Sequence, residues 1–190
     1  MSIVPGSISA VAQREGASVA ETFGNASTII LADTSGSMGA RDSRDRQSRY
    51  DVLLQELAAL QAKMSGKIAV LNFSSTARWS PGGQPEFLGG NTDLAGALRF
   101  GKIADTAGRR FIVISDGSPD DEQAALKIAA TYQSKISTVY VGPENGYGSS
   151  GKGFLERLAA ASGGQSATAD RVMELAATVE ALLLTGGDKQ

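Results

Sequence analysis

The chain has 190 residues, of which 42 % are hydrophobic and 20 % charged, and a formal net charge of −2; this composition is typical of one soluble globular domain. It contains no cysteine and no histidine, which excludes disulfides, thiolate metal sites and histidine or cysteine catalysis and leaves oxygen ligands as the available metal chemistry. The balanced charge excludes a broad attraction to nucleic acid or to an anionic membrane, and without a basic start or a spanning apolar run we expect a cytoplasmic protein.

Residues 1–26 predict an amphipathic N-terminal extension. Their larger apolar side chains fall on one helical face, interrupted by Gly16: Ile8, Val11, Ala12, Val19 and Phe23. Such a helix docks more often on its own domain than on another protein, and we expect the same here.

Residues 27–185 predict an α/β domain, because short apolar runs alternate with segments of helical period. Strands are expected at 28–32, 67–73, 111–115, 136–141 and 165–167, and helices at 50–64, 92–103, 120–133, 154–161 and 171–184. A short edge hairpin is expected around Arg78 and Trp79, and residues 186–190 form a tail. The predicted fold is a three-layer, doubly wound (Rossmann-like), mostly parallel sheet with helices on both faces.

Three polar clusters fall where predicted strands end and helices begin. Residues 33–37 follow the first strand, residues 89–93 open a helix, and residues 115–118 follow a central strand. Such sheets bind ligands beyond the carboxyl ends of their strands, so the clusters are expected on one rim. Together they offer two carboxylates and three hydroxyls, a set that suits a hard divalent cation such as Mg²⁺ and leaves it electrophilic toward an outside carboxylate.

These residues resemble the metal-ion-dependent adhesion motif of von Willebrand factor A domains. Asp33, Ser35 and Ser37 match its Asp-x-Ser-x-Ser, and Thr92 and Asp116 match its threonine and second aspartate. The resemblance implies the von Willebrand A fold and an Mg²⁺, Mn²⁺ or Ca²⁺ ion. It implies that the hydroxyls of the two serines and the threonine bind the metal directly, that the aspartates often act through waters, and that a partner can supply the sixth ligand.

The resemblance covers residues 27–184 and implies metal-dependent protein binding without catalysis. The expected partner is a protein that supplies an Asp or Glu carboxylate. Similar intracellular members of the family often work with AAA+ ATPases of the MoxR or chelatase type, or as modules of prokaryotic multiprotein complexes, and this is the context that the resemblance suggests.

Other interpretations of the same residues remain open. Each cluster alone is also explained as a helix cap or a turn, and the metal could serve only to tighten the fold. An aspartyl phosphatase usually carries an acid two residues after its nucleophile, where this chain has Ser35. Residues 146–153 approach the phosphate-binding loop of nucleotide enzymes, but Gly153 stands where a hydroxyl is needed.

A mixed-charge segment, residues 41–49, follows the first cluster. It is either a solvated loop or a surface that steers an acidic partner toward the metal. The candidate partner-binding side chains are its four arginines, Arg41, Arg44, Arg46 and Arg49.

Overall fold

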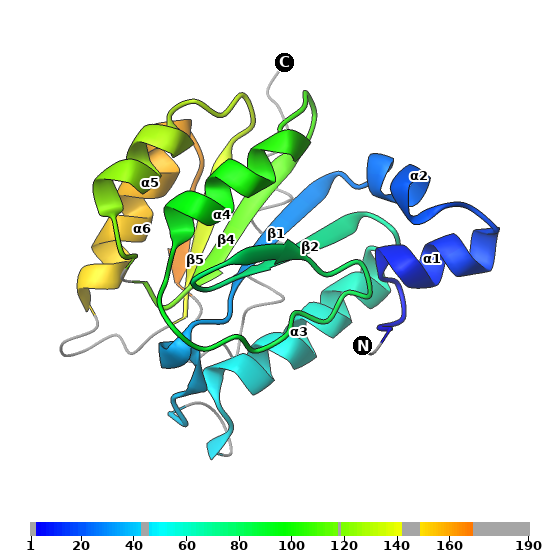
Figure 1. The fold of residues 1–190 in the computed structure, drawn as a ribbon, viewed down its shortest axis with the longest axis horizontal. Helices are drawn as coiled ribbons and strands as arrows, with labels where there is room; N and C mark the ends of the chain where they lie inside the picture. The colour runs from blue at the N-terminus through cyan, green and yellow to red at the C-terminus, as the bar shows by residue number, and fades with distance from the viewer. Residues whose placement is uncertain (1–2, 43–45, 118, 142–148, 169–190) are drawn as a thin grey trace.

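The computed structural model describes residues 3–42, 46–117, 119–141 and 149–168, which form one six-stranded sheet (Figure 1). The strand order is β3-β2-β1-β4-β5-β6, and every neighbouring pair is parallel except β2 and β3. The strands are β1 (Thr28–Asp33), β2 (Ile68–Phe73), β3 (Ala77–Trp79), β4 (Arg110–Ser115), β5 (Ile136–Tyr140) and β6 (Ser166–Thr168). This sheet confirms the predicted doubly wound α/β class.

The central strands are continuous apolar runs because both of their faces are covered. Every residue of β1 and β2 is buried. Along β1 the side chains alternate between two cores: Ile29 and Leu31 belong to one, and Ile30 and Ala32 to the other. The sheet therefore separates two apolar layers, as the predicted three-layer architecture requires.

Helices cover both faces of the sheet (Figure 1). One core contains Leu53 and Leu57 of α3, and the other contains Leu98 of α4, Ala125 of α5 and Leu158 of α6. The bounds are α3 (Arg49–Lys63), α4 (Leu94–Gly101), α5 (Glu122–Ala129) and α6 (Ser149–Ser162). No helix within the described ranges is long and apolar enough to cross a membrane. The predicted helix 171–184 and the tail 186–190 lie outside the described residues.

The N-terminal segment folds as two helices, α1 (Ile8–Glu15) and α2 (Val19–Gly24), because Gly16 takes a left-handed conformation and ends the first. Ile8 is 2 % exposed and joins the core beneath α4. Phe23 packs edge-on against Trp79 of β3 at 4.8 Å between ring centroids. Val19, grouped with these residues in the sequence pattern, is instead 44 % exposed.

Three helix starts differ from the sequence prediction, and for two of them a capping carboxylate is the reason. Helix α4 begins at Leu94 because the Asp93 carboxylate accepts the Gly96 N–H at 2.7 Å and caps the helix. Helix α5 begins after Asp121, which caps it in the same way. Helix α6 begins at Ser149, five residues before the predicted start. Thr92 therefore stands in a loop rather than in a helix.

Candidate metal centre

The candidate site lies where the sheet reverses its winding direction. From β1 the chain moves outward to β2 and β3, then returns to β4 on the other side of β1. Asp33 ends β1, and Asp116 follows the last residue of β4. The carboxyl edge at such a reversal is the usual ligand position in doubly wound folds.

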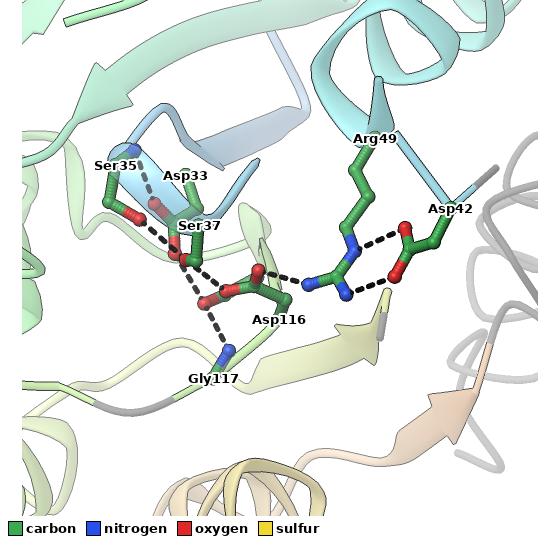
Figure 2. A network of polar contacts seen from close by, with 8 residues as sticks. Asp33, Ser35, Ser37, Asp42, Arg49, Asp116 and Gly117 are labelled. Atoms are coloured by element: carbon green, nitrogen blue, oxygen red, sulfur yellow. Dashed lines mark hydrogen bonds and ion pairs between the residues drawn. The ribbon is translucent and has the colours of Figure 1, made fainter. Parts of the chain in front are cut away.

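Four of the five predicted ligands form one hydrogen-bonded chain (Figure 2). The Ser35 N–H donates to Asp33 Oδ1 at 2.8 Å, and Ser35 Oγ lies 3.3 Å from Ser37 Oγ. Ser37 Oγ in turn donates to Asp116 Oδ1 at 2.9 Å. The fold thus brings together oxygens that are 79 positions apart in the sequence.

The first loop is fixed by the residues between its ligands. Thr34 is buried, and both its N–H and its hydroxyl donate to the Phe73 carbonyl at the end of β2. After Ser35 the chain enters a short 3₁₀ helix, η1 (Gly36–Gly39), whose Met38 is buried in the core on the α3 side. Thr34 and Met38, which lie on either side of the two serines, therefore anchor the loop. Ser37 is exposed at its tip.

The loop that carries Thr92 contacts the first polar cluster, but among the described residues the Thr92 side chain does not join the hydrogen-bonded chain of the other ligands. The Gly36 N–H donates to the Gly90 carbonyl at 3.1 Å, which joins the first and second polar clusters. The Thr92 N–H donates to Asp120 Oδ1 at 3.2 Å, and its carbonyl accepts the Asp120 N–H. Within the described part of the chain, no hydrogen bond joins the Thr92 hydroxyl to the other four predicted ligands.

Asp33 is a carboxylate without a compensating cation. It is fully buried, and burial raises its pKa to about 6, although hydrogen bonds from Ser115 and Ser35 act in the opposite direction and the charge of Asp116 raises it further. No ion pair to Asp33 occurs among the described residues. Buried charges are usually paired or bound to a metal. The negative charge of Asp33 is therefore not balanced by the described residues at this edge of the sheet.

The spacing of the oxygens fits a small hard cation. Around Mg²⁺ the ligand oxygens stand at 2.0–2.1 Å in an octahedron, so adjacent oxygens lie about 2.9 Å apart. The separation between Ser37 and Asp116 oxygens is 2.9 Å and that between the two serine hydroxyls is 3.3 Å. Within the described ranges no three Asp or Glu residues cluster as ligands, so any metal here depends on the hydroxyls.

The four candidate arginines have different surroundings. Arg41 and Arg46 are exposed, and Arg46 adopts a left-handed backbone conformation with φ of 58°. Arg44 lies outside the described residues. Arg49 faces the site: its Nη1 donates to Asp116 Oδ2, and its Nε and Nη2 donate to the two oxygens of Asp42. The bonds to Asp42 and the charge of Asp116 raise the pKa of Arg49, although burial opposes this, so the guanidinium stays charged.

Two residues of the site were not identified as functional from the sequence. Ser115 donates to Asp33 Oδ2 at 2.5 Å and accepts the Gly117 N–H at 3.0 Å. Asp42 holds the Arg49 guanidinium. A polar residue that ends an otherwise apolar strand is the signal for Ser115; for Asp42 the only signal was its membership of the mixed-charge segment.

The glycine-rich segment 146–153 is described only from residue 149, where it forms the first turn of α6. A Cβ on Gly151 would lie 2.8 Å from the Asp116 carbonyl and 2.9 Å from Gly117 Cα. Gly151 is therefore required for close packing of α6 against the loop that carries Asp116. The backbone of Asp116 and Gly117 therefore packs directly against this turn.

No family model matches the sequence, and no curated protein matches it. Solved structures do resemble the fold. An aerotolerance-related membrane protein from Bacteroides fragilis aligns with a TM-score of 0.65 at 15 % identity, over 84 % of this chain and 99 % of that chain. Manganese-loaded TRAP protein from Plasmodium vivax aligns with a TM-score of 0.56 at 16 % identity, over 84 % of this chain and 74 % of that one.

A von Willebrand factor type A protein from Catenulispora acidiphila aligns with a TM-score of 0.57 at 17 % identity, over 82 % of this chain and 41 % of that one. Likenesses at such low identity establish the fold alone. The chain thus has the von Willebrand A fold.

Proposed function

We propose that this chain is a metal-dependent protein-interaction module without catalytic activity. In this proposal a divalent cation, Mg²⁺ with Mn²⁺ or Ca²⁺ as substitutes, is held by the five predicted ligands, Asp33, Ser35, Ser37, Thr92 and Asp116. An acidic side chain of a partner protein completes the coordination. The setting is an intracellular multiprotein complex, and a MoxR-type AAA+ ATPase is a candidate partner.

The observation that carries the proposal is the buried Asp33, which has no ion pair within the described residues and lies beside a chain of hydroxyl and carboxylate oxygens. A purely structural site would place a lysine or an arginine against such a carboxylate. The structural likeness to a protein that was crystallised with manganese adds support from outside the chain. The two carboxylates balance the charge of a dication, and neutral hydroxyls supply other ligands, so a bound Mg²⁺ keeps a water-filled position that a partner carboxylate can take.

The metal is tested by calorimetric titration of Mg²⁺, Mn²⁺ and Zn²⁺ into the purified chain. We expect one site that prefers Mg²⁺ or Mn²⁺ over Zn²⁺, because the ligands are hard oxygens. The double variant Asp33→Asn with Asp116→Asn should lose it, and Glu15→Gln on α1, an exposed carboxylate in a pair with Arg14, is the matched control. Undiminished binding in the double variant would remove the proposed site.

The open coordination position is tested with acetate as the carboxylate probe. Water relaxation in the Mn²⁺-loaded chain should fall as acetate replaces a metal-bound water. Thr92→Ala should weaken acetate binding more than it weakens Mn²⁺ binding, because the resemblance gives its hydroxyl a direct place in the shell while both aspartates remain. Relaxation that is indifferent to acetate would favour a metal that only tightens the fold.

A further inference from the structure

Arg49 joins the candidate site to the first turn of α3 (Figure 2). Its Nη1 lies 2.5 Å from Asp116 Oδ2, and its Nε and Nη2 lie 2.9 Å and 2.5 Å from the two oxygens of Asp42. The side chain of Arg49 is 11 % exposed and that of Asp116 is 6 % exposed. The contact between them is therefore largely shielded from water.

The two carboxylates depend on this guanidinium to different degrees. Asp42 is 47 % exposed, so water has access to its charge. Asp116 is nearly buried, and a buried carboxylate requires a cation or several donors. Arg49 thus does for Asp116 what a bound metal would do.

The metal and the guanidinium need the same carboxylate. Asp116 Oδ1 accepts the Ser37 hydroxyl, and Asp116 Oδ2 accepts Arg49. A dication bound to Ser37 and Asp116 would stand one carboxylate away from a second positive charge, and the two would repel. Because two of its three hydrogen bonds go to Asp42, Arg49 can leave Asp116 and remain held.

We infer that Arg49 is an internal counter-ion that competes with the divalent metal for Asp116. This inference rests on the proposed metal site and describes its regulation. Without metal, Arg49 neutralises Asp116 and closes the site; metal loading moves the guanidinium onto Asp42 alone. Occupancy of the site is thereby transmitted to the N-terminal end of α3 and to Asp42.

The inference is tested by measuring Mn²⁺ affinity at one fixed ionic strength. Arg49→Gln removes the charge and should bind Mn²⁺ about tenfold more tightly, since even water-like screening leaves a repulsion of that size between a guanidinium and a neighbouring dication. Arg49→Lys keeps the charge and should stay within about threefold of the wild type. Arg14→Gln, a 63 % exposed arginine on α1, is the matched control and should change nothing.

The outcomes separate this inference from the proposed function. If the wild type binds Mn²⁺ and Arg49→Gln binds equally or more weakly, Arg49 does not compete and the inference is wrong, while the metal site stands. If only Arg49→Gln binds, the guanidinium masks the site and the inference holds. If neither the wild type nor Arg49→Gln binds Mn²⁺, the proposed metal site is wrong, and the inference that depends on it is wrong as well.

A measurement on the wild-type chain covers the case in which Arg49→Gln does not fold. The side-chain N–H signals of Arg49, assigned by their loss in Arg49→Lys, are followed by NMR during a Mg²⁺ titration. They should shift along the same curve as the metal occupancy, because the bond to Asp116 is released. Signals that stay fixed at saturation would overturn the inference.

Discussion

Two carboxylates, one at each edge of the sheet, have side chains that are shielded from water but have opposite partners. Asp33, at the carboxyl edge, is 0 % exposed and has hydroxyl and N–H partners but no ion pair within the described residues. The Asp105 side chain, at the amino edge before β4, is 2 % exposed. It accepts the Gln133 and Ser134 N–H groups at 2.9 Å each and the Lys102 ammonium at 3.0 Å.

The pKa values of the two groups move in opposite directions. Burial raises the pKa of Asp33 to about 6. Burial also acts to raise the pKa of Asp105, but its hydrogen bonds from Gln133, Lys102 and Ser134 outweigh it and hold the pKa below the ordinary value. The charge of Asp105 is thus balanced within the amino edge, where it supports the fold. The carboxyl edge is short of positive charge, and in the proposed function it binds the metal.

The largest expected effect is on unfolding at the amino edge. Asp105→Ala leaves two backbone N–H groups without an acceptor, and each such group costs about 1–3 kcal/mol when buried. Because Gln133 is exposed and water can reach its N–H, we expect a loss of about 2–4 kcal/mol rather than the full sum. Asp33→Asn is isosteric and removes an uncompensated charge, so it should not lower the free energy of unfolding by more than about 1 kcal/mol, and above about pH 6 it should raise it. Urea unfolding in the presence of chelator measures both changes in the free energy of unfolding. A larger loss in Asp33→Asn than in Asp105→Ala would contradict the proposed difference between the two edges.

Metal should stabilise the chain only through the carboxyl edge. At a free Mg²⁺ concentration of one hundred times Kd, linkage gives about 2.7 kcal/mol of added stability. We expect this gain in the wild type and also in Asp105→Asn, although the variant is less stable than the wild type without Mg²⁺. Asp33→Asn should show no such gain. Thermal unfolding with and without Mg²⁺ checks the prediction, and a gain that persists in Asp33→Asn would mean that the ion binds elsewhere.

The two edges should respond oppositely to pH when chelator is present. The folded-state pKa of Asp33 lies above its unfolded value of 3.8, so its contribution is complete below about pH 4 and is lost as pH rises through about 6, on the order of 1–3 kcal/mol. The folded-state pKa of Asp105 is lowered, so its contribution is present above about pH 4 and is lost as pH falls.

Denaturation curves between pH 3 and pH 7 test this assignment. Asp33→Asn should flatten the decline between pH 4 and pH 6, and Asp105→Asn should flatten the rise at lower pH. If the decline between pH 4 and pH 6 survives in Asp33→Asn, another group causes it.

The smallest effect on stability is expected at the tip of the metal loop. Ser37 is exposed, and surface substitutions of this kind usually change the free energy of unfolding by less than about 0.5 kcal/mol. Ser37→Ala should therefore unfold like the wild type in chelator and bind Mg²⁺ more weakly. A large loss of stability without metal would show that the loop supports the fold and not only the ion.

Much of the fold was predictable from the sequence because its signals are local. The apolar runs of β1, β2, β4 and β5 and the helical period of α3 lie within single segments, and each was placed within one or two residues. Helix starts were less accurate, since the Asp93 and Asp121 caps are set by individual side-chain hydrogen bonds rather than by periodicity. The separation of α1 from α2 followed from Gly16, which the sequence pattern had already marked.

For the site, the sequence by itself determined the kind of chemistry: without histidine or cysteine only oxygen ligands were available, and three polar clusters stood at strand ends. Only the tertiary structure decided which charges meet. Ser115 reaches Asp33 across 82 positions, and Arg49 reaches Asp116 across 67. A residue's type and its place on a strand are local properties, but burial and pairing depend on which distant segments pack together, and the unpaired Asp33 and the engaged Arg49 are consequences of that packing.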